Sequence, residues 1–189
     1  MNEDEKNKIK EEIEETLNAV LKSVGYEYLD DNEIEIDMDN LHEKPRKLKE
    51  EVKEIAVYMF KYGDTWLKIG KVGEKSNNRF LYQHYNPNSC KSNLAKQLLN
   101  DTENYKNELK EYRKKYKENN TDEDFIEDFR KWIKTNISRI NIYINLTGKK
   151  YEEYKYYILS LFESALQCKF KPIYENNIHE KTGEKYGRN

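Results

Sequence analysis

The chain has 189 residues, and its 34 Lys and Arg side chains nearly balance its 36 Asp and Glu side chains, which gives a formal net charge of −2. A near-neutral total argues against a polybasic binder of the histone type, and two cysteines and three scattered histidines provide neither a disulfide framework nor zinc-ligand spacing. No apolar run approaches the roughly 18 residues of a membrane span, and the N-terminus lacks the apolar stretch of a signal peptide. We therefore expect a soluble, cytoplasmic protein that does not contact membranes.

The charge is distributed unevenly along the chain. Residues 1–54 carry 18 acidic and 9 basic side chains, whereas residues 55–189 carry 18 acidic and 25 basic ones. The net charges of −9 and +7 divide the chain into an acidic N-terminal extension and a basic body. The near-neutral total therefore does not argue against an anionic partner for the body.

The acidic extension is expected to be mainly helical. Apolar residues recur at spacings of three and four over residues 3–24, which predicts an amphipathic helix that ends before Gly25. Residues 30–40 alternate acidic and apolar side chains, as in a short strand or extended segment, and Pro45 is expected to begin a second helix. We interpret residues 1–54 as a helical subdomain packed on the body. The alternatives are a dimerisation element and a mimic of nucleic-acid charge.

The body is expected to begin with a β-hairpin, because two runs of β-forming residues, 55–62 and 65–72, flank a Gly-Asp pair. A third strand is expected over 139–146, where polar and apolar residues alternate. Thr121 resembles the first residue of a capping box that leads into a helix. The helices of the body are expected at about residues 76–85, 93–99, 104–118, 121–134 and 150–170. This order predicts an α+β fold with a small, three-stranded, mostly antiparallel sheet flanked by helices.

Four side chains with the chemistry of phosphodiester hydrolysis follow these elements in order. Tyr58 ends an Ala-Val-Tyr motif in the first strand, and Lys68 begins a Lys-Ile-Gly motif in the second. Arg79 lies in the helix after the hairpin, and Glu163 lies in the last helix, nine residues before Pro172. An Arg fork suits phosphate oxygens, and one carboxylate is enough to hold a Mg²⁺ ion that keeps most of its waters.

This order of motifs resembles the GIY-YIG nuclease superfamily. The resemblance covers residues 55–176, with a helical insertion at about 92–135, and leaves residues 1–54 as an extension and 177–189 as a polar tail. It implies a small α+β nuclease domain with Mg²⁺ or Mn²⁺ as cofactor. It also implies hydrolysis of DNA phosphodiester bonds by a one-metal mechanism.

The resemblance also implies a role for each candidate residue. Tyr58 is the candidate general base, Arg79 the phosphate clamp and Glu163 the metal ligand. The first motif lacks its glycine, and Lys68 stands where the family usually has Tyr, so either Tyr58 or Lys68 takes the proton from the attacking water. His84 is the preferred counterpart of a residue that often follows the Arg in the family. The structural alternative is a core tyrosine, a solvated lysine and a surface arginine.

The helical insertion contains a run of basic residues interleaved with tyrosines. Such a helix can follow a phosphate backbone. It can equally be a solvated helix whose lysines pair with glutamates, and the tyrosines also suit an oligomer interface. Together with a lysine in the second strand, the candidate nucleic-acid-binding residues are Lys71, Lys110, Arg113, Lys114, Lys115 and Lys117.

We expect DNA as the partner, with RNA as the alternative, and a homodimer as one way for a single site to cut both strands. Two other functions fit the same residues. One is a nucleic-acid-binding or interaction module without turnover, and the other is an RNA-directed nuclease or toxin-like effector. Bacterial or phage defence, mobile-element homing and repair all use domains of this family, and the sequence does not choose among them.

Overall fold

The computed structural model describes residues 1–26, 33–38, 46–74, 76–90, 93–146 and 149–174. Within this part the chain divides into two compact units, with boundaries between residues 75 and 76 and between 137 and 138. The first unit is a sheet with helices, and the second unit is helical. The α+β class expected from the sequence is therefore confirmed. None of the described helices is long and apolar enough to cross a membrane.

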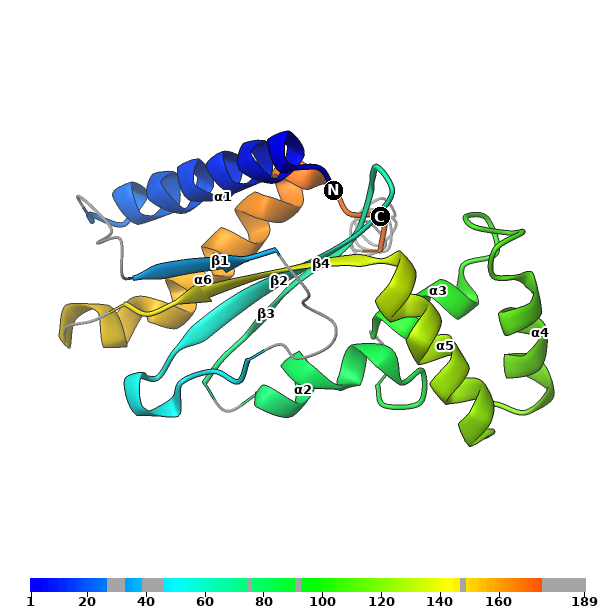
Figure 1. Ribbon diagram of the computed structural model, residues 1–189. Coiled ribbons are helices and arrows are strands. Elements are labelled where there is room, and N and C mark those ends of the chain that lie inside the picture. The colour runs from blue at the N-terminus through cyan, green and yellow to red at the C-terminus, as the bar shows by residue number, and fades with distance from the viewer. Residues whose placement is uncertain (27–32, 39–45, 75, 91–92, 147–148, 175–189) are drawn as a thin grey trace, which may run out of the picture. The chain divides into compact units, whose positions relative to one another are not determined.

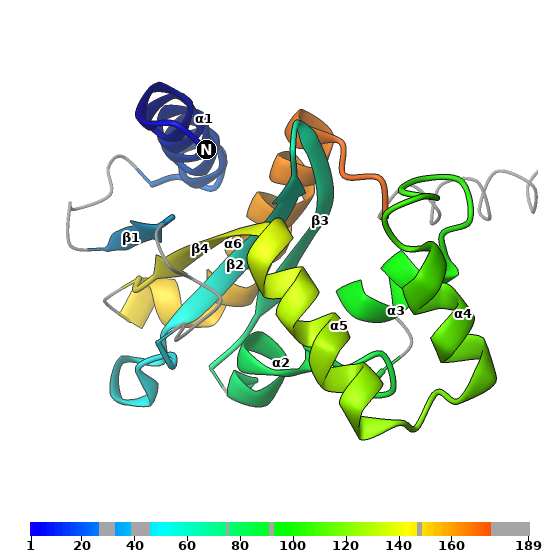
Figure 2. The same ribbon diagram turned by 45° about the vertical axis from the view of Figure 1, so that its right-hand side comes forward.

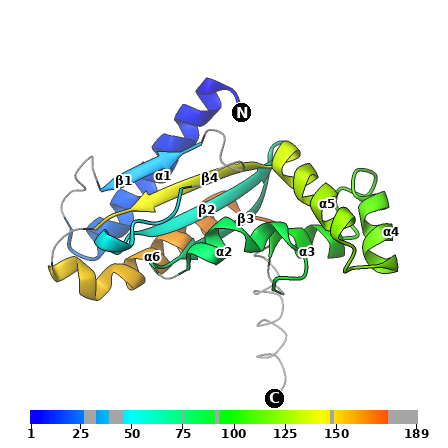
Figure 3. The ribbon, with the colours of Figure 1, turned by 60° about the horizontal axis from the view of Figure 1, so that its bottom comes forward.

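The first unit is built on an antiparallel sheet with the strand order β1-β4-β2-β3 (Figures 1 and 3). Its strands are β1 (Ile34–Asp37), β2 (Ile55–Tyr62), β3 (Thr65–Val72) and β4 (Ser138–Ile144). The expectation of three strands was wrong, because the described sheet has four. The additional strand, β1, comes from the acidic N-terminal segment and pairs with β4, so that Ile34 lies opposite Ile144.

One face of this sheet carries the hydrophobic core. Helices α1 (Glu3–Ser23) and α6 (Lys149–Phe170) lie on this side of the sheet (Figure 2). Their apolar side chains belong to the same cluster as alternate residues of the strands. Ile13 and Leu17 of α1 are fully buried in it. The predicted N-terminal helix is confirmed, and its apolar stripe packs into the core of the sheet unit.

The opposite face of the sheet is more polar. Strand alternation places Tyr58 and Lys68 on this face, because their neighbours Met59 and Ile69 belong to the core cluster. At the β1 end, Arg46 stacks over the ring of Tyr143, with 3.5 Å between the guanidinium carbon and the ring centroid.

Arg46 also joins two carboxylates near this end of the sheet. It donates to Glu54 at 2.6 and 2.9 Å and to Glu35 at 2.7 and 3.2 Å. Glu54 is only 2% exposed, so this ion pair is largely buried. The cluster fastens the segment around the short 3₁₀ helix η1 (Glu50–Val52) to strands β1 and β4.

The second unit is a set of short helices around aromatic side chains. They are α2 (Asn77–Leu81), the 3₁₀ turn η2 (Gln83–Tyr85), α3 (Leu94–Asn100), α4 (Lys110–Glu118) and α5 (Glu123–Asn136). Tyr112 of α4 packs against Phe129 of α5, with 5.1 Å between ring centroids, and also lies beside Phe125 and Trp132. The aromatic side of α4 is therefore used inside the unit.

Two local expectations for the second unit were wrong. Helix α4 begins at Lys110 and not near residue 104, because Tyr105 has a φ of 53°, which is incompatible with an α-helix. The cap of α5 is Asp122, whose carboxylate accepts from the amide of Phe125 at 3.2 Å, and not Thr121. Both residue types favour the N-cap, so the sequence alone did not separate them.

Candidate functional site

Tyr58 and Gly70 form a closely packed pair on the polar face of the sheet. They lie opposite each other on the neighbouring strands β2 and β3. The ring of Tyr58 lies over Gly70, because a Cβ atom added to the glycine would lie 2.9 Å from Cε2 and closer still to Cζ and Oη. Tyr58 is fully buried. The phenol of the first motif thus occupies the space that the glycine of the second motif leaves empty.

Lys68 lies on the same face, two residues before Gly70, and is 4% exposed. Across the sheet, Lys68 and Arg139 both pair with Phe60, one from each side. The guanidinium carbon of Arg139 lies 5.5 Å from the Phe60 ring centroid, and the Phe60 ring lies 5.6 Å from that of Tyr58. Two cationic side chains therefore flank the same aromatic residue on the face that carries Tyr58.

Arg139 and Asn141 were not among the predicted site residues. Arg139 is 1% exposed and donates through Nε to Oδ1 of Asn141 at 2.8 Å. Asn141 lies opposite Tyr58 in the β2–β4 register. The sequence held a signal for both, because Arg139, Asn141 and Tyr143 occupy alternate positions of an otherwise apolar strand. Three polar side chains on one face of a buried strand indicate a polar layer and not a simple core.

Glu163 approaches β3 from the other face of the sheet. Its carboxylate lies 2.9 Å from the ammonium of Lys71, and Lys71 also donates to the hydroxyl of Ser160 at 2.8 Å. The Glu163 side chain is 18% exposed, so its carboxylate is accessible to a small ligand. Gly70 and Lys71 are successive residues of β3 and face opposite sides of the sheet, so the structure does not bring Tyr58 and Glu163 together on one face.

This carboxylate is chemically suitable for a hard divalent cation. Among the described residues, no group of three or more His, Cys, Asp or Glu side chains gathers in one place. Mg²⁺ does not require such a group, because it keeps several waters and binds one or two carboxylates together with substrate phosphates. Glu163 therefore fits as a single protein ligand, and binding would require Lys71 to release the carboxylate.

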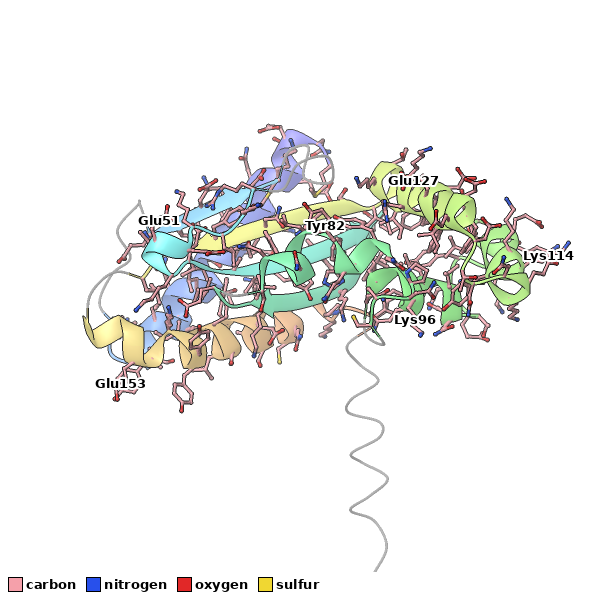
Figure 4. The ribbon with its side chains drawn as sticks, turned by 90° about the horizontal axis from the view of Figure 1, so that it is seen from below. Glu51, Tyr82, Lys96, Lys114, Glu127 and Glu153 are labelled. Carbon is pink, nitrogen blue, oxygen red and sulfur yellow. The ribbon has the colours of Figure 1, made fainter. Side chains whose placement is uncertain are left out.

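Arg79 and His84 belong to the second compact unit. Arg79 lies in helix α2, and its side chain lies outside the described part of the structure. His84 is 2% exposed, and its Nδ1 accepts from the amide of Leu94, the first residue of α3, at 3.3 Å. This contact helps to begin α3. Tyr82, two residues before His84, is 64% exposed (Figure 4).

The basic run of the insertion is divided by the fold. Lys110, Arg113, Lys114 and Lys117 line an open hollow in the second unit, whereas Lys115 is exposed outside it. Four of the five candidates in this run therefore share one surface. The sixth candidate, the strand lysine, forms the ion pair at the Glu163 carboxylate described above.

Comparisons with models of protein families, with curated proteins and with solved structures gave no match.

Proposed function

We propose that this protein is a Mg²⁺-dependent endonuclease of the GIY-YIG type that hydrolyses DNA phosphodiester bonds, with Mn²⁺ as an alternative cofactor. The observation that carries the proposal is the pairing of Tyr58 with Gly70. A core tyrosine can pack beside many small residues. Tyr58, however, packs on a position where only glycine leaves room for its ring. The tyrosine of the first motif and the glycine of the second motif therefore depend on each other, which supports reading the two motifs together.

The chemistry follows from the side chains of this chain. Tyr58 or Lys68, whichever is the general base, takes a proton from water. The resulting hydroxide attacks phosphorus in line, and the bond from phosphorus to the 3′ oxygen breaks. Arg79 contributes two parallel hydrogen bonds to phosphate oxygens. Glu163 would hold Mg²⁺, which would supply positive charge for the leaving oxygen. Because Tyr58 and Glu163 lie on opposite faces of the edge strand β3, a phosphate served by both would have to lie at this edge of the sheet.

A plasmid-cleavage assay tests this proposal directly. Supercoiled DNA incubated with the protein and Mg²⁺ should be nicked or linearised, and EDTA should prevent this. Glu163→Gln should reduce cleavage by about 10²- to 10⁴-fold, and so should whichever of Tyr58→Phe and Lys68→Met removes the general base. Glu153→Gln is the matched control, because Glu153 is an exposed glutamate of the same helix (Figure 4).

The same assay separates the competing functions. Cleavage by Glu163→Gln at the wild-type rate would overturn the site assignment. DNA binding without any cleavage by the wild type would favour the non-catalytic module. Cleavage of single-stranded RNA but not of plasmid DNA would favour the RNA-directed nuclease or toxin-like effector.

A further inference from the structure

The second unit contains a hollow that is lined only by cationic side chains. Its volume is about 330 Å³, and the residues that line it, which we call the cationic hollow, are Lys106, Lys110, Arg113, Lys114 and Lys117. The four lysines are exposed, and Lys114 projects from the outer side of α4 (Figure 4). Such a concentration of one charge in a concave site favours an anionic ligand.

Helix α4 separates its aromatic residues from its cations. Tyr112 and Tyr116 pack against rings of α5, with Tyr116 6.1 Å from Phe125 between centroids. The lysines at 110, 114 and 117 recur at spacings of four and three, which places them together on one helical face. The tyrosines of this run are thus part of the unit's own core, and the basic face is left for contact with another molecule.

Arg113 gives the hollow a fixed base. It is 9% exposed and donates to the carbonyl oxygens of Leu98 at 3.1 and 3.4 Å, Asn104 at 2.8 Å and Tyr105 at 3.4 Å. These bonds hold the segment before α4, in which Tyr105 adopts a left-handed backbone conformation, and so they hold Lys106 beside the helix. The charge of Arg113 remains within the hollow, although most of its hydrogens are already bonded.

The lysines of the hollow have little compensation from nearby acids. No described carboxylate lies within ion-pair distance of Lys110, Lys114 or Lys117. Lys106 pairs with Glu103 at 3.4 Å, but both side chains are more than half exposed, so this pair contributes little. The sequence left open whether this helix follows a phosphate backbone or is a solvated helix whose lysines pair with glutamates. The described structure favours the first, because Lys110, Lys114 and Lys117 form no such pairs.

We propose that the cationic hollow binds the phosphate backbone of a nucleic acid, at a site separate from the hydrolytic residues. The choice of nucleic acid rests on the proposed function. Lys110 to Lys117 spans about 10 Å at 1.5 Å per residue, which is the length of about three phosphates at 3.4 Å along one strand. A row of this length suits a linear polyanion better than one small anion. The apolar side of α4 faces α5, so the helix has no apolar face to insert into a membrane.

The test measures binding in the absence of cleavage. Fluorescence anisotropy of a labelled DNA duplex in EDTA, over a series of salt concentrations, gives the affinity and its salt dependence. Lys110→Gln with Lys114→Gln should lower the slope of log affinity against log salt by about 1.8, since each lost phosphate contact removes about 0.9. This corresponds to about 30-fold weaker binding near 0.15 M salt.

The matched control is Lys96→Gln with Lys131→Gln, which removes the same charge from two lysines of the same unit that do not line the hollow. It should leave the slope nearly unchanged. Equal weakening by both double variants, each shown by circular dichroism to be folded, would overturn the proposal. The proposal would also be overturned if the Lys110→Gln and Lys114→Gln double variant lost binding to phosphatidylserine vesicles but kept its DNA affinity, because the ligand of the hollow would then be a lipid surface.

The two proposals fail in different ways. Glu163→Gln should retain wild-type DNA affinity while losing cleavage. A wild-type protein that binds DNA through the hollow but never cuts it would refute the endonuclease and leave the hollow intact. Unchanged affinity in the Lys110 and Lys114 double variant, with cleavage lost only in Glu163→Gln, would refute the hollow and leave the endonuclease intact.

Discussion

The packing of Tyr58 on Gly70 can be tested by the smallest possible change, Gly70→Ala. The added Cβ would lie 2.9 Å from Cε2 of Tyr58 and nearer still to Cζ and Oη, all in a fully buried ring. The backbone of Gly70 does not have a positive φ, so alanine is strained there only by this contact. The ring would have to move, and Phe60, 5.6 Å away between centroids, restricts where it can go.

The expected cost follows from two opposing effects. Overpacking a buried site typically costs about 1–3 kcal/mol, while replacing glycine within a strand recovers about 0.5–1 kcal/mol. We therefore expect Gly70→Ala to lower the free energy of unfolding by about 1–2 kcal/mol. Because the displaced group is the candidate base, DNA cleavage should fall by more than the loss of folded protein explains.

Gly73→Ala is the matched control for this experiment. Its Cβ would also approach a tyrosine ring, 2.9 Å from Cε1 of Tyr156, but Tyr156 is 46% exposed and can swing into solvent. Its cost should therefore stay within about 0.5 kcal/mol. Urea unfolding followed by circular dichroism gives both values. If Gly70→Ala and Gly73→Ala had the same free energy of unfolding and the same cleavage rate, the close packing of Tyr58 on Gly70 would not be required for stability or cleavage.

Three further predictions concern the ion pairs and the buried phenol. Lys71→Met should raise the affinity of Glu163 for Mn²⁺ by about two- to fivefold, measured by electron paramagnetic resonance, because the carboxylate loses a competing ammonium; unchanged affinity would contradict this. Arg46→Ala should lower the free energy of unfolding in urea by about 2–4 kcal/mol, because Glu54, 2% exposed, loses its cation; a change below about 0.5 kcal/mol would contradict a buried pair. Burial raises the pKa of Tyr143 from 10.0 to about 12. The free energy of unfolding should therefore be unaffected by this group below pH 10 and should fall by about 2–3 kcal/mol as the pH rises towards 12, and Tyr143→Phe should remove that part of the decline.

The local elements were predictable because their signals are local. The hairpin strands span residues 55–62 and 65–72, as the β-forming runs on either side of the Gly-Asp pair indicated. The first helix was predicted over residues 3–24 and ends at Ser23, one residue earlier. Its end was predictable because the apolar spacing stops at the turn that contains Gly25. Patterns of this kind require no knowledge of the rest of the chain.

Pairings between distant segments were not predictable in the same way. The alternation at residues 34–37 indicated a strand, but nothing local shows that its partner is β4, about 100 residues later. The late start of the helix predicted over 104–118 depends on the left-handed backbone of Tyr105. Arg113 stabilises this conformation by donating to the carbonyl oxygens of Asn104 and Tyr105. Both features arise from tertiary contacts, which override local propensity.

The candidate site also has a part that local sequence signals predict and a part that depends on contacts between distant segments. Tyr58, Lys68 and Gly70 were identified from motif order, and the register of a hairpin makes their pairing a local matter. The contact between Lys71 and Glu163 joins residues 92 positions apart in the chain, so the predicted nucleic-acid contact at Lys71 could not be weighed against this ion pair from sequence. This ion pair forms only because α6 packs against β3 in the folded chain.

The acidic N-terminal extension also takes on a different meaning in the folded chain. Glu5 pairs with Lys61 of β2, and Glu15 lies 3.7 Å from Lys169 of α6. Part of the extension's negative charge is therefore matched by cations of the sheet unit, and part of the body's excess of +7 is used in those pairs. The cations of the hollow have no such partners among the described carboxylates, apart from the exposed pair at Lys106. Within the described part of the chain, the cations of α4 thus have the least compensation by carboxylates, and charge substitutions there should affect DNA binding more than equal substitutions on the sheet unit.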